Sequence, residues 1–327
     1  MSQAEISSRK GEHIKLCLDS ESQGKESLFP GVNLPYAALP EINLDDVSTA
    51  VNLFGSELSQ PLIISSMTGG TEHGNKINTN LAIAAQASQV ALGVGSQRIG
   101  LENPEAAKSF EVFRRHAPSA FILANMGAIQ LNNGYGVDHY RKVIEMVQAD
   151  AIYLHINPLQ EALQPGGDSN YAGLLSKITD LVKRLDVPVF IKEVGHGIDL
   201  KTAQALIDAG VAGIDVAGVG GTSYAWVEAK RANNNDFAEW FKDLGITTEQ
   251  SIRAIAPIKG SAKLVASGGI RSPIEGYKAH LIGADLYAST RPFLQAALVS
   301  SDAVNDVIEN WQRGLRVAMF ATGTASW

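Results

Sequence analysis

The chain has 327 residues, of which 45% are hydrophobic and 19% are charged, and its formal net charge at pH 7 is −7. This composition allows a sizeable hydrophobic core, and the negative balance argues against a general nucleic-acid-binding protein. The single cysteine, Cys17, excludes an intramolecular disulfide and fits a reducing compartment. The sequence shows no hydrophobic run of transmembrane length and no signal peptide, so we expect a cytoplasmic protein without a membrane partner.

Residues 1–60 form a lead-in that repeats no pattern found later in the chain. An N-terminal arm carries the basic pair Arg9 and Lys10, and scattered apolar side chains follow it up to position 60. A charged arm of this kind is most often simply solvated, and alone it indicates no function. We expect residues 1–60 to pack on a main domain that comprises residues 61–327.

From residue 61 onward, short apolar runs typical of buried strands alternate with amphipathic helical patterns. The eight predicted strands are 62–65, 90–94, 121–124, 151–155, 187–192, 213–216, 264–266 and 284–288. Apolar residues recur at helical spacing in two stripes, Leu174, Ile178, Leu181 and Val182, and Leu200, Ala203, Leu206 and Ile207. Asp199 and the Ser272–Pro273 pair are typical helix starts, and a long helix is predicted from about Asp302.

Eight strand–helix repeats predict a (β/α)₈ TIM barrel. A doubly wound open sheet is the alternative. It is disfavoured by the number of repeats and by the lack of an early G-x-G-x-x-G after the first strand.

Polar side chains follow the predicted strands, where a barrel places its active site. The fourth strand leads into His155, Asn157, Gln160 and Glu161, and Pro158 prevents the strand from continuing. One such loop would be unremarkable, but polar or glycine-rich residues follow every strand. The repetition indicates a functional mouth at the carboxyl ends of the strands.

Two glycine-rich loops predict a phosphate site. Gly268 and Gly269 follow the seventh strand and precede the helix that starts at Pro273, and Gly220 and Gly221 follow the sixth. Backbone N–H groups in such turns converge on anions, and barrels often hold a phosphate after strands seven and eight. A Gly-Gly pair is usually just a tight turn. We predict a phosphorylated ligand because this pair follows the seventh strand, where barrels often bind phosphate.

Lys192 ends the fifth predicted strand, and its charge needs an anionic partner at the mouth. It fits four roles: a Schiff-base nucleophile, a phosphate ligand, a cation beside an electron-rich cofactor, or a structural ion pair with a carboxylate of the next strand. Glu161 with its neighbouring oxygens suits Mg²⁺, whereas no His/Cys cluster indicates zinc. His196 is either catalytic or a plain loop residue.

Eight motifs occur along the chain in this order: R-K-x-E-H-I at 9–14, I-S-S-M-T-G-G at 64–70, G-V-G-S-Q-R at 93–98, N-x-G-A at 125–128, H-x-N-x-x-Q-E at 155–161, K-E-V-G at 192–195, D-V-A-G-x-G-G-T-S at 215–223 and S-G-G-I-R at 267–271. Together they resemble the type 2 isopentenyl-diphosphate isomerases over almost the whole chain. Several occur in FMN-binding barrels at large, but the first and the fifth are distinctive.

The resemblance implies an FMN-dependent enzyme that interconverts isopentenyl and dimethylallyl diphosphates in isoprenoid biosynthesis. It implies that FMN must be reduced, commonly by NADPH, and that Mg²⁺ is required. It also implies a homo-oligomer, either a tetramer or an octamer.

Motif by motif, the resemblance assigns FMN binding to Met67, Thr68, Gly69, Ser96, Asn125, Lys192 and Thr222. It assigns the phosphate end of FMN to Gly269, Ile270, Arg271, Ala288 and Ser289. It assigns substrate binding to Arg9, Lys10, Ser96, Gln97, Arg98 and Gln160, Mg²⁺ binding to Glu161, and catalysis to Gln160, Lys192 and His155.

The chemistry agrees with these roles. Moving a double bond by one carbon adds a proton at one end and removes one at the other, through a cation that a dry, apolar site stabilises. We hypothesise that reduced flavin is the acid–base group and that Lys192 stabilises its anionic form. Arg9 and Lys10 would then close over the diphosphate.

Two features depart from the family pattern. Ala288 stands where the family usually has a glycine, which alters the expected phosphate nest. Residues 231–245 form an excursion between the sixth and seventh strands, either a mobile lid or an ordinary insertion.

Two other functions compete with this interpretation. An FMN-dependent 2-hydroxy acid oxidase would need a basic histidine near the substrate, and none occurs at the ends of strands six and seven, residues 215–224 and 267–271. A flavin-binding protein without catalysis would have no use for Gln160 and Glu161.

Overall fold

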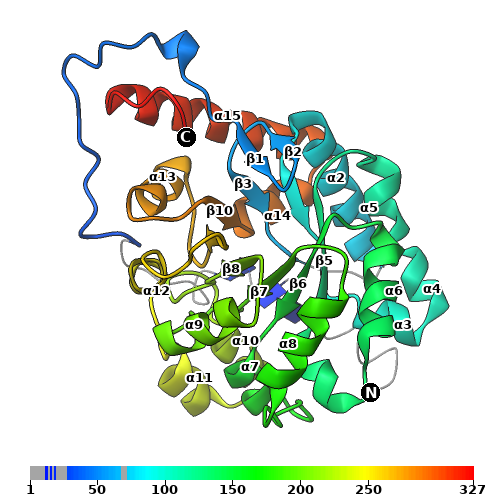
Figure 1. Cartoon of the computed structure of the whole chain (residues 1–327). Coiled ribbons are helices and arrows are strands. Elements are labelled where there is room, and N and C mark those ends of the chain that lie inside the picture. The colour runs from blue at the N-terminus through cyan, green and yellow to red at the C-terminus, as the bar shows by residue number, and fades with distance from the viewer. Residues whose placement is uncertain (1–11, 14, 17, 20–27, 68–71) are drawn as a thin grey trace.

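The computed structural model describes residues 12–13, 15–16, 18–19, 28–67 and 72–327, and in it eight parallel strands form a closed barrel surrounded by helices (Figure 1). The strand order is β10-β3-β4-β5-β6-β7-β8-β9. Each strand therefore pairs with its sequence neighbours, and the eighth closes on the first. The predicted (β/α)₈ barrel is confirmed, and the open-sheet alternative is wrong.

All eight predicted strands are present. They are β3 (Leu62–Ile64), β4 (Ala91–Gly93), β5 (Ile122–Gly127), β6 (Ala151–His155), β7 (Val189–Lys192), β8 (Gly213–Asp215), β9 (Lys263–Ala266) and β10 (Leu286–Ser289). The strand predicted at 121–124 extends to Gly127, because its later residues pair in register with β6.

Helices connect the strands and cover the outside of the barrel. They are α2 (Glu72–Ser88), α3 (Arg98–Glu102), α4 (Pro104–Lys108), α5 (Glu111–His116), η3 (Ala128–Asn133), α6 (Val137–Val147), α7 (Pro158–Leu163), α8 (Leu174–Arg184), α9 (Leu200–Asp208), α10 (Tyr224–Arg231), α11 (Asn235–Phe241), α12 (Thr248–Ile255), α13 (Pro273–Leu281), α14 (Arg291–Ala297) and α15 (Ser301–Ala321).

The predicted helix signals act as expected. The side chain of Asp199 accepts a hydrogen bond from the backbone N–H of Thr202, and Ser272 caps α13 in the same way. The apolar stripe of α8 is buried on the barrel at Leu174, Ile178 and Leu181. Leu200, the first residue of α9, is the exception and is 49% exposed.

The core has two layers separated by the barrel wall. Outward-facing strand residues pack against the helices, and inward-facing residues fill the barrel. A hairpin of β1 (Val51–Leu53) and β2 (Ser56–Leu58) contributes Leu53 and Leu58 to the inner layer. Its turn residue Phe54 contacts Phe190 edge-on. The hairpin therefore packs on the barrel interior.

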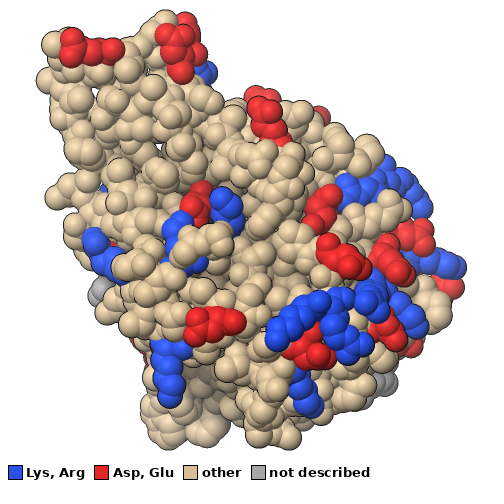
Figure 2. All heavy atoms as spheres, in the orientation of Figure 1, with Lys and Arg blue, Asp and Glu red and all other residues tan. Residues whose placement is uncertain are grey.

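Before the hairpin, residues 33–46 run as an extended segment that contains the short helix η2 (Leu44–Asp46) and projects from the barrel beside α15 (Figure 1). The N–H of Ala37 donates to the carbonyl of Ala321, while Tyr36 and Leu39 are 78% and 77% exposed. On the face in Figure 2, basic side chains are interspersed with acidic ones. No helix in the described residues is long and apolar enough to cross a membrane.

Candidate active site

A cavity of about 300 Å³ opens at the carboxyl ends of the barrel strands. The residues predicted for the site that line it are Met67, Ser96, Arg98, Asn125, His155, Gln160, Glu161, Lys192, Thr222, Gly269, Ile270, Arg271, Ala288 and Ser289. Each strand end supplies part of this lining, because parallel strands deliver their carboxyl ends to one face. The structure thus brings together side chains that are far apart in the sequence.

Five predicted residues do not line the described cavity. Arg9, Lys10, Thr68 and Gly69 lie outside the described residues. Gln97 is fully buried behind the wall, where its amide donates to the carbonyl of Val143 and accepts from the N–H of Asn125. We therefore correct its assignment, since both ends of its side chain brace the wall instead of facing a substrate.

The glycine-rich loops after β8 and β9 pack backbone against backbone. Gly268 and Gly269 have φ of +90° and +92°, a region that side chains disfavour. A Cβ at Gly269 would lie 2.5 Å from the carbonyl oxygen of Gly220. Arg271 Nη2 also donates to this oxygen at 2.7 Å. Only glycine permits this close contact between the two backbones. The loop then leads into α13 at Pro273, so backbone N–H groups and a helix start lie together, as a phosphate cradle requires.

Lys192 points into the cavity from the end of β7. Its Nζ donates to the carbonyl oxygen of Glu193 at 2.9 Å and lies 4.0 Å from Oδ2 of Asp215 on β8. Ser267 donates to the other oxygen of this fully buried carboxylate. The structural ion pair considered from the sequence is therefore present. It is long enough that the ammonium keeps capacity to bind a ligand.

Glu193 organises the loop that follows Lys192. One carboxylate oxygen accepts from the backbone N–H groups of Val194, Gly195 and His196 at 2.6, 2.6 and 2.5 Å. Burial raises the pKa of Glu193, and these hydrogen bonds oppose the rise. His196 bonds to the carbonyl of Leu244 through Nδ1 and to the N–H of Ala225 through Nε2. It is therefore a loop residue that anchors the 231–245 excursion.

His155 is a neutral hydrogen-bonding group. Asn125 Nδ2 donates to the carbonyl of Val94, so its Oδ1, 2.8 Å from His155 Nδ1, accepts from that nitrogen. Burial, with the charges of Lys192 and Arg98, lowers the pKa of His155 to about 4. The ring carries its hydrogen on Nδ1 at neutral pH and leaves Nε2 as an acceptor.

Gln160 and Glu161 are held by Asn157 at the start of α7. Asn157 Nδ2 donates to Gln160 Oε1 and to Glu161 Oε1, both at 2.9 Å. The second oxygen of Glu161 accepts from the N–H of Asp168 at 2.8 Å. Among the described residues, no group of three or more His, Cys, Asp or Glu could hold a metal ion. A metal at Glu161 would therefore need ligand oxygens from the substrate.

No local sequence pattern indicates Glu228, which the structure places against the cavity residue Gln160. It is fully buried on α10, and one carboxylate oxygen accepts from Gln160 Nε2 and bonds to His13 Nε2, both at 3.0 Å. Arg231 contacts the other oxygen. Although burial opposes ionisation, the bonds and charges of His13, Gln160 and Arg231 lower the pKa of Glu228 to about 2.

Sequence signals for the overlooked residues differ. Asp215 is a carboxylate in a short apolar strand, and such a buried charge could have been recognised. Glu228 lies in a helix where Glu is common, so no local pattern distinguishes it. It meets Gln160 across 68 positions of sequence and His13 across 215.

The residues around the cavity fit a bound flavin. Ser66 Oγ is buried at the cavity wall and has no hydrogen-bond partner among the described residues. A buried hydroxyl without a partner is costly, so it is best explained by a ligand. The backbone cradle at Gly268–Arg271 supplies an anion site in the lining of the same cavity. A phosphorylated, hydrogen-bonding cofactor satisfies both features.

Comparison with known proteins agrees with this geometry. Residues 169–327 match the family model of FMN-dependent dehydrogenases. Mandelate oxidase structures superpose with TM-scores of 0.65 and 0.67 at 18% and 19% identity, each covering 99% of this chain and 95% of the other, which shows the fold alone.

Curated relatives match along the whole chain. Isopentenyl-diphosphate delta-isomerases of Stutzerimonas stutzeri and Nostoc sp. are 46% and 43% identical over 99% of this chain, covering 95% and 93% of their own lengths. That of Cronobacter sakazakii is 44% identical over 100% of this chain and 95% of its own. The chain belongs to the isopentenyl-diphosphate delta-isomerase family.

Proposed function

We propose that this protein is an FMN-dependent isomerase that interconverts isopentenyl diphosphate and dimethylallyl diphosphate. The observation that carries the proposal is the single cavity. Residues assigned to the flavin, such as Asn125, line it together with residues assigned to the diphosphate, such as Arg98, and to the metal, Glu161. The relatives that share this chain's full length bear the name of the same activity.

Within this proposal, FMN lies against Met67, Ser96, Asn125 and Thr222, with its phosphate at Gly269–Arg271 and the end of β10. When bound in its reduced form, the flavin supplies an electron-rich ring and an exchangeable proton. Lys192 places its ammonium beside the ring and favours negative charge there. Ala288 lines the cavity wall at the end of β10, where this phosphate is proposed to bind.

The chain's own polar groups position the substrate. The amide of Gln160 is fixed at both ends, by Asn157 and by Glu228, so it presents one orientation to the cavity. His155 stays neutral and offers Nε2 as an acceptor. Arg98 and the predicted clamp of Arg9 and Lys10 bind the diphosphate, and closure of that clamp keeps water from the cationic intermediate.

We propose that Mg²⁺ binds to Glu161 and to diphosphate oxygens. A metal that keeps most of its waters suits one protein carboxylate, which is what the cavity offers. NADPH is the proposed reductant of the flavin and the cytoplasm the proposed location. A homo-oligomer, a tetramer or an octamer, is proposed as well; the exposed Tyr36 and Leu39 offer apolar surface to a second subunit.

Oxidation of a 2-hydroxy acid is a poorer fit to this cavity. That reaction needs a histidine basic enough to remove a proton. Among the described residues at the strand ends, the histidine that lines the cavity is His155, and its pKa is lowered to about 4. His155 is therefore too weak a base for this role.

The test is a direct assay of the purified protein. With isopentenyl diphosphate, reduced FMN and Mg²⁺, we expect dimethylallyl diphosphate, identified by NMR or mass spectrometry. Lactate and glycolate serve as control substrates, and their oxidation without isomerisation would refute the proposal. Protein loaded with 5-deaza-FMN tests the role of the flavin: exchange of solvent protons into the substrate by that form would contradict flavin as the acid.

A further inference from the structure

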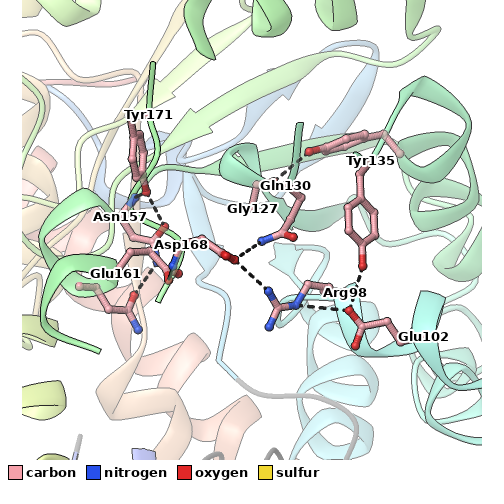
Figure 3. A network of polar contacts seen from close by, with 11 residues as sticks. Arg98, Glu102, Gly127, Gln130, Tyr135, Asn157, Glu161, Asp168 and Tyr171 are labelled. Carbon is pink, nitrogen blue, oxygen red and sulfur yellow. Dashed lines mark hydrogen bonds and ion pairs between the residues drawn. The ribbon is translucent and has the colours of Figure 1, made fainter. Parts of the chain in front are cut away.

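Asp168 lies in the loop between α7 and α8, and it connects side chains from three successive strand ends (Figure 3). Its Oδ2 accepts from Gln130 Nε2 at 3.2 Å and from Arg98 Nη1 at 3.4 Å. Its backbone N–H donates to Glu161 Oε2 at 2.8 Å. A single residue thus contacts both the predicted diphosphate ligand Arg98 and the predicted metal ligand Glu161.

Two nitrogens of the Arg98 guanidinium face different carboxylates (Figure 3). Nη1 faces Asp168, and Nε lies 3.7 Å from Glu102 Oε1. Tyr135 donates its hydroxyl to the same Glu102 oxygen at 2.9 Å. Neither carboxylate contact uses Nη2. Because the guanidinium is planar and rigid, two such contacts fix its orientation and leave that edge for a ligand in the cavity that Arg98 lines.

The loop that carries Asp168 is pressed against α7. A Cβ added to Gly167 would lie 2.1 Å from the carbonyl oxygen of Glu161 and 3.0 Å from its Oε2. The nearest atom belongs to the backbone of α7, which cannot move aside without distorting the helix. The position of Asp168 is therefore tied to the helix that carries Gln160 and Glu161, and a change in one is transmitted to the other.

We propose that Asp168 is a positioning residue for the diphosphate site. Its carboxylate orients Arg98, and its N–H orients Glu161, so the arginine and the metal-binding carboxylate keep a constant relative geometry. This inference rests on the proposed function and deepens it.

Charge and orientation predict opposite effects of removing the Asp168 carboxylate on diphosphate binding. A third carboxylate beside Glu102 and Glu161 repels an incoming diphosphate, so its removal would strengthen anion binding by Coulomb's law. If Asp168 instead orients Arg98, removing its carboxylate weakens diphosphate binding, because the ligand must then order Arg98 at an entropic cost. The sign of the change therefore separates the two explanations.

The experiment compares Asp168→Ala with the wild-type FMN-loaded protein, using inorganic diphosphate and Mg²⁺ in calorimetric titrations. We expect Kd to rise about tenfold, or about 1.4 kcal/mol. KM for isopentenyl diphosphate should rise similarly and kcat should change less than about threefold, since the arginine contacts ground and transition states alike. An unchanged or lower Kd overturns the proposal.

The matched control is Asp180→Asn, which breaks an exposed Asp–Arg pair of 3.2 Å on α8 without touching the cavity. Its diphosphate Kd should equal that of the wild type. Asp168→Asn separates charge from contact: it removes the charge but keeps an acceptor, so its loss should be smaller than that of Asp168→Ala. Tighter diphosphate binding by both Asp168 variants would show that the carboxylate repels the ligand, and it would refute the positioning role.

A double-mutant cycle with Arg98→Ala tests whether Asp168 acts through that arginine. In the Arg98→Ala background, Asp168→Ala should change the diphosphate Kd by less than about twofold. A full tenfold loss there contradicts the proposal. Flavin absorbance and the unfolding midpoint establish that each variant is folded. If the wild type does not isomerise its substrate, the proposed function fails, yet the diphosphate titrations still decide the role of Asp168.

Discussion

The two ends of the barrel use charged residues in opposite ways. At the end where the strands begin, two ion-paired aspartates satisfy the backbone of neighbouring strands. At the end where the strands finish, charged and polar groups retain unused hydrogen-bonding capacity. The contrast separates residues that stabilise the fold from residues that await a ligand.

The base of the barrel carries the same arrangement twice, on the third and fourth strands and again on the seventh and eighth. Asp150 precedes β6 and its Oδ2 accepts from the N–H of Ile122 in β5 at 2.8 Å and from Arg114 at 2.9 Å. Asp285 precedes β10 and likewise accepts from the N–H of Leu264 in β9 and from Lys259. Each aspartate also donates its own N–H to the same strand residue.

The mouth is less complete. Asp215 Oδ2 and Ser66 Oγ are buried without a hydrogen-bond partner among the described residues. Lys192 is 4.0 Å from its carboxylate. Natural proteins rarely leave such groups unpaired, and Ser66 lines the cavity, so its hydroxyl indicates one place where a ligand atom completes the bonding. Stability is therefore expected to depend on the base and activity on the mouth.

Glu228 should be the largest exception to this separation of stability from activity. It lies at the mouth, yet its carboxylate has partners on both oxygens, so it should contribute to both. Glu228→Gln should lower kcat/KM about 100-fold through Gln160, and lower the free energy of unfolding by about 3 kcal/mol by breaking a buried ion pair. Steady-state kinetics and urea unfolding measure both. Glu111→Gln, which alters an exposed pair of 3.6 Å, is the control. Wild-type kinetics in Glu228→Gln would show that Gln160 needs no such support.

His155 gives the mouth a pH-dependent cost to stability. Its pKa is about 4 in the fold against 6.5 ordinarily, so between these values the unfolded chain binds a proton that the folded chain does not. The free energy of unfolding should therefore fall as pH drops from 6.5 to 4, by up to about 3 kcal/mol. Urea unfolding across this range, compared with His155→Asn, isolates the effect. Parallel pH curves for the two proteins would exclude it.

At the base, Asp150→Ala and Asp285→Ala should each lower the free energy of unfolding by about 2 kcal/mol and leave kcat and KM within about twofold. The side chain of Asp150 is 39% exposed, so its ion pair contributes little, and the main cost is the strand N–H left unpaired. The double variant should show additive losses, since the sites share no partners. A change in kinetics would break the separation of base from mouth.

Ser66→Ala should change stability and activity least among these variants, and it tests directly whether the Ser66 hydroxyl bonds to the flavin. Removing an unpaired hydroxyl should leave the flavin-free protein as stable as the wild type, within about 1 kcal/mol. If the hydroxyl bonds to the flavin, the Kd for FMN should rise about fivefold, measured by fluorescence quenching. A destabilised apoprotein with normal FMN affinity would assign Ser66 to the fold.

Much of the architecture was predictable because it depends on local pattern. Apolar runs indicated all eight strands, and amphipathic stripes indicated helices. Asp199 and Ser272 indicated helix starts, since capping needs only neighbouring residues. Strand order then follows from the short connections of the fold. Most predicted site residues lie at the mouth for the same reason: a residue just after a barrel strand has no other place to go.

Side-chain direction was not predictable. Gln97 follows β4 as Ser96 does, yet it turns away from the cavity, because the N–H of Asn125 and the carbonyl of Val143 in α6 offer it partners there. Nothing in the sequence near Asp168 shows that it would meet Arg98, 70 positions away.

The sequence by itself determined the barrel, its eight strand ends and the glycine turns at the phosphate cradle, because periodicity, capping and positive φ are properties of adjacent residues. Only the tertiary structure decided that Glu228, Asp168 and His13 join this site. Their partners come from other strand ends or other helices, and a hydrogen bond forms only where closure of the barrel brings donor and acceptor within 3 Å or so of each other.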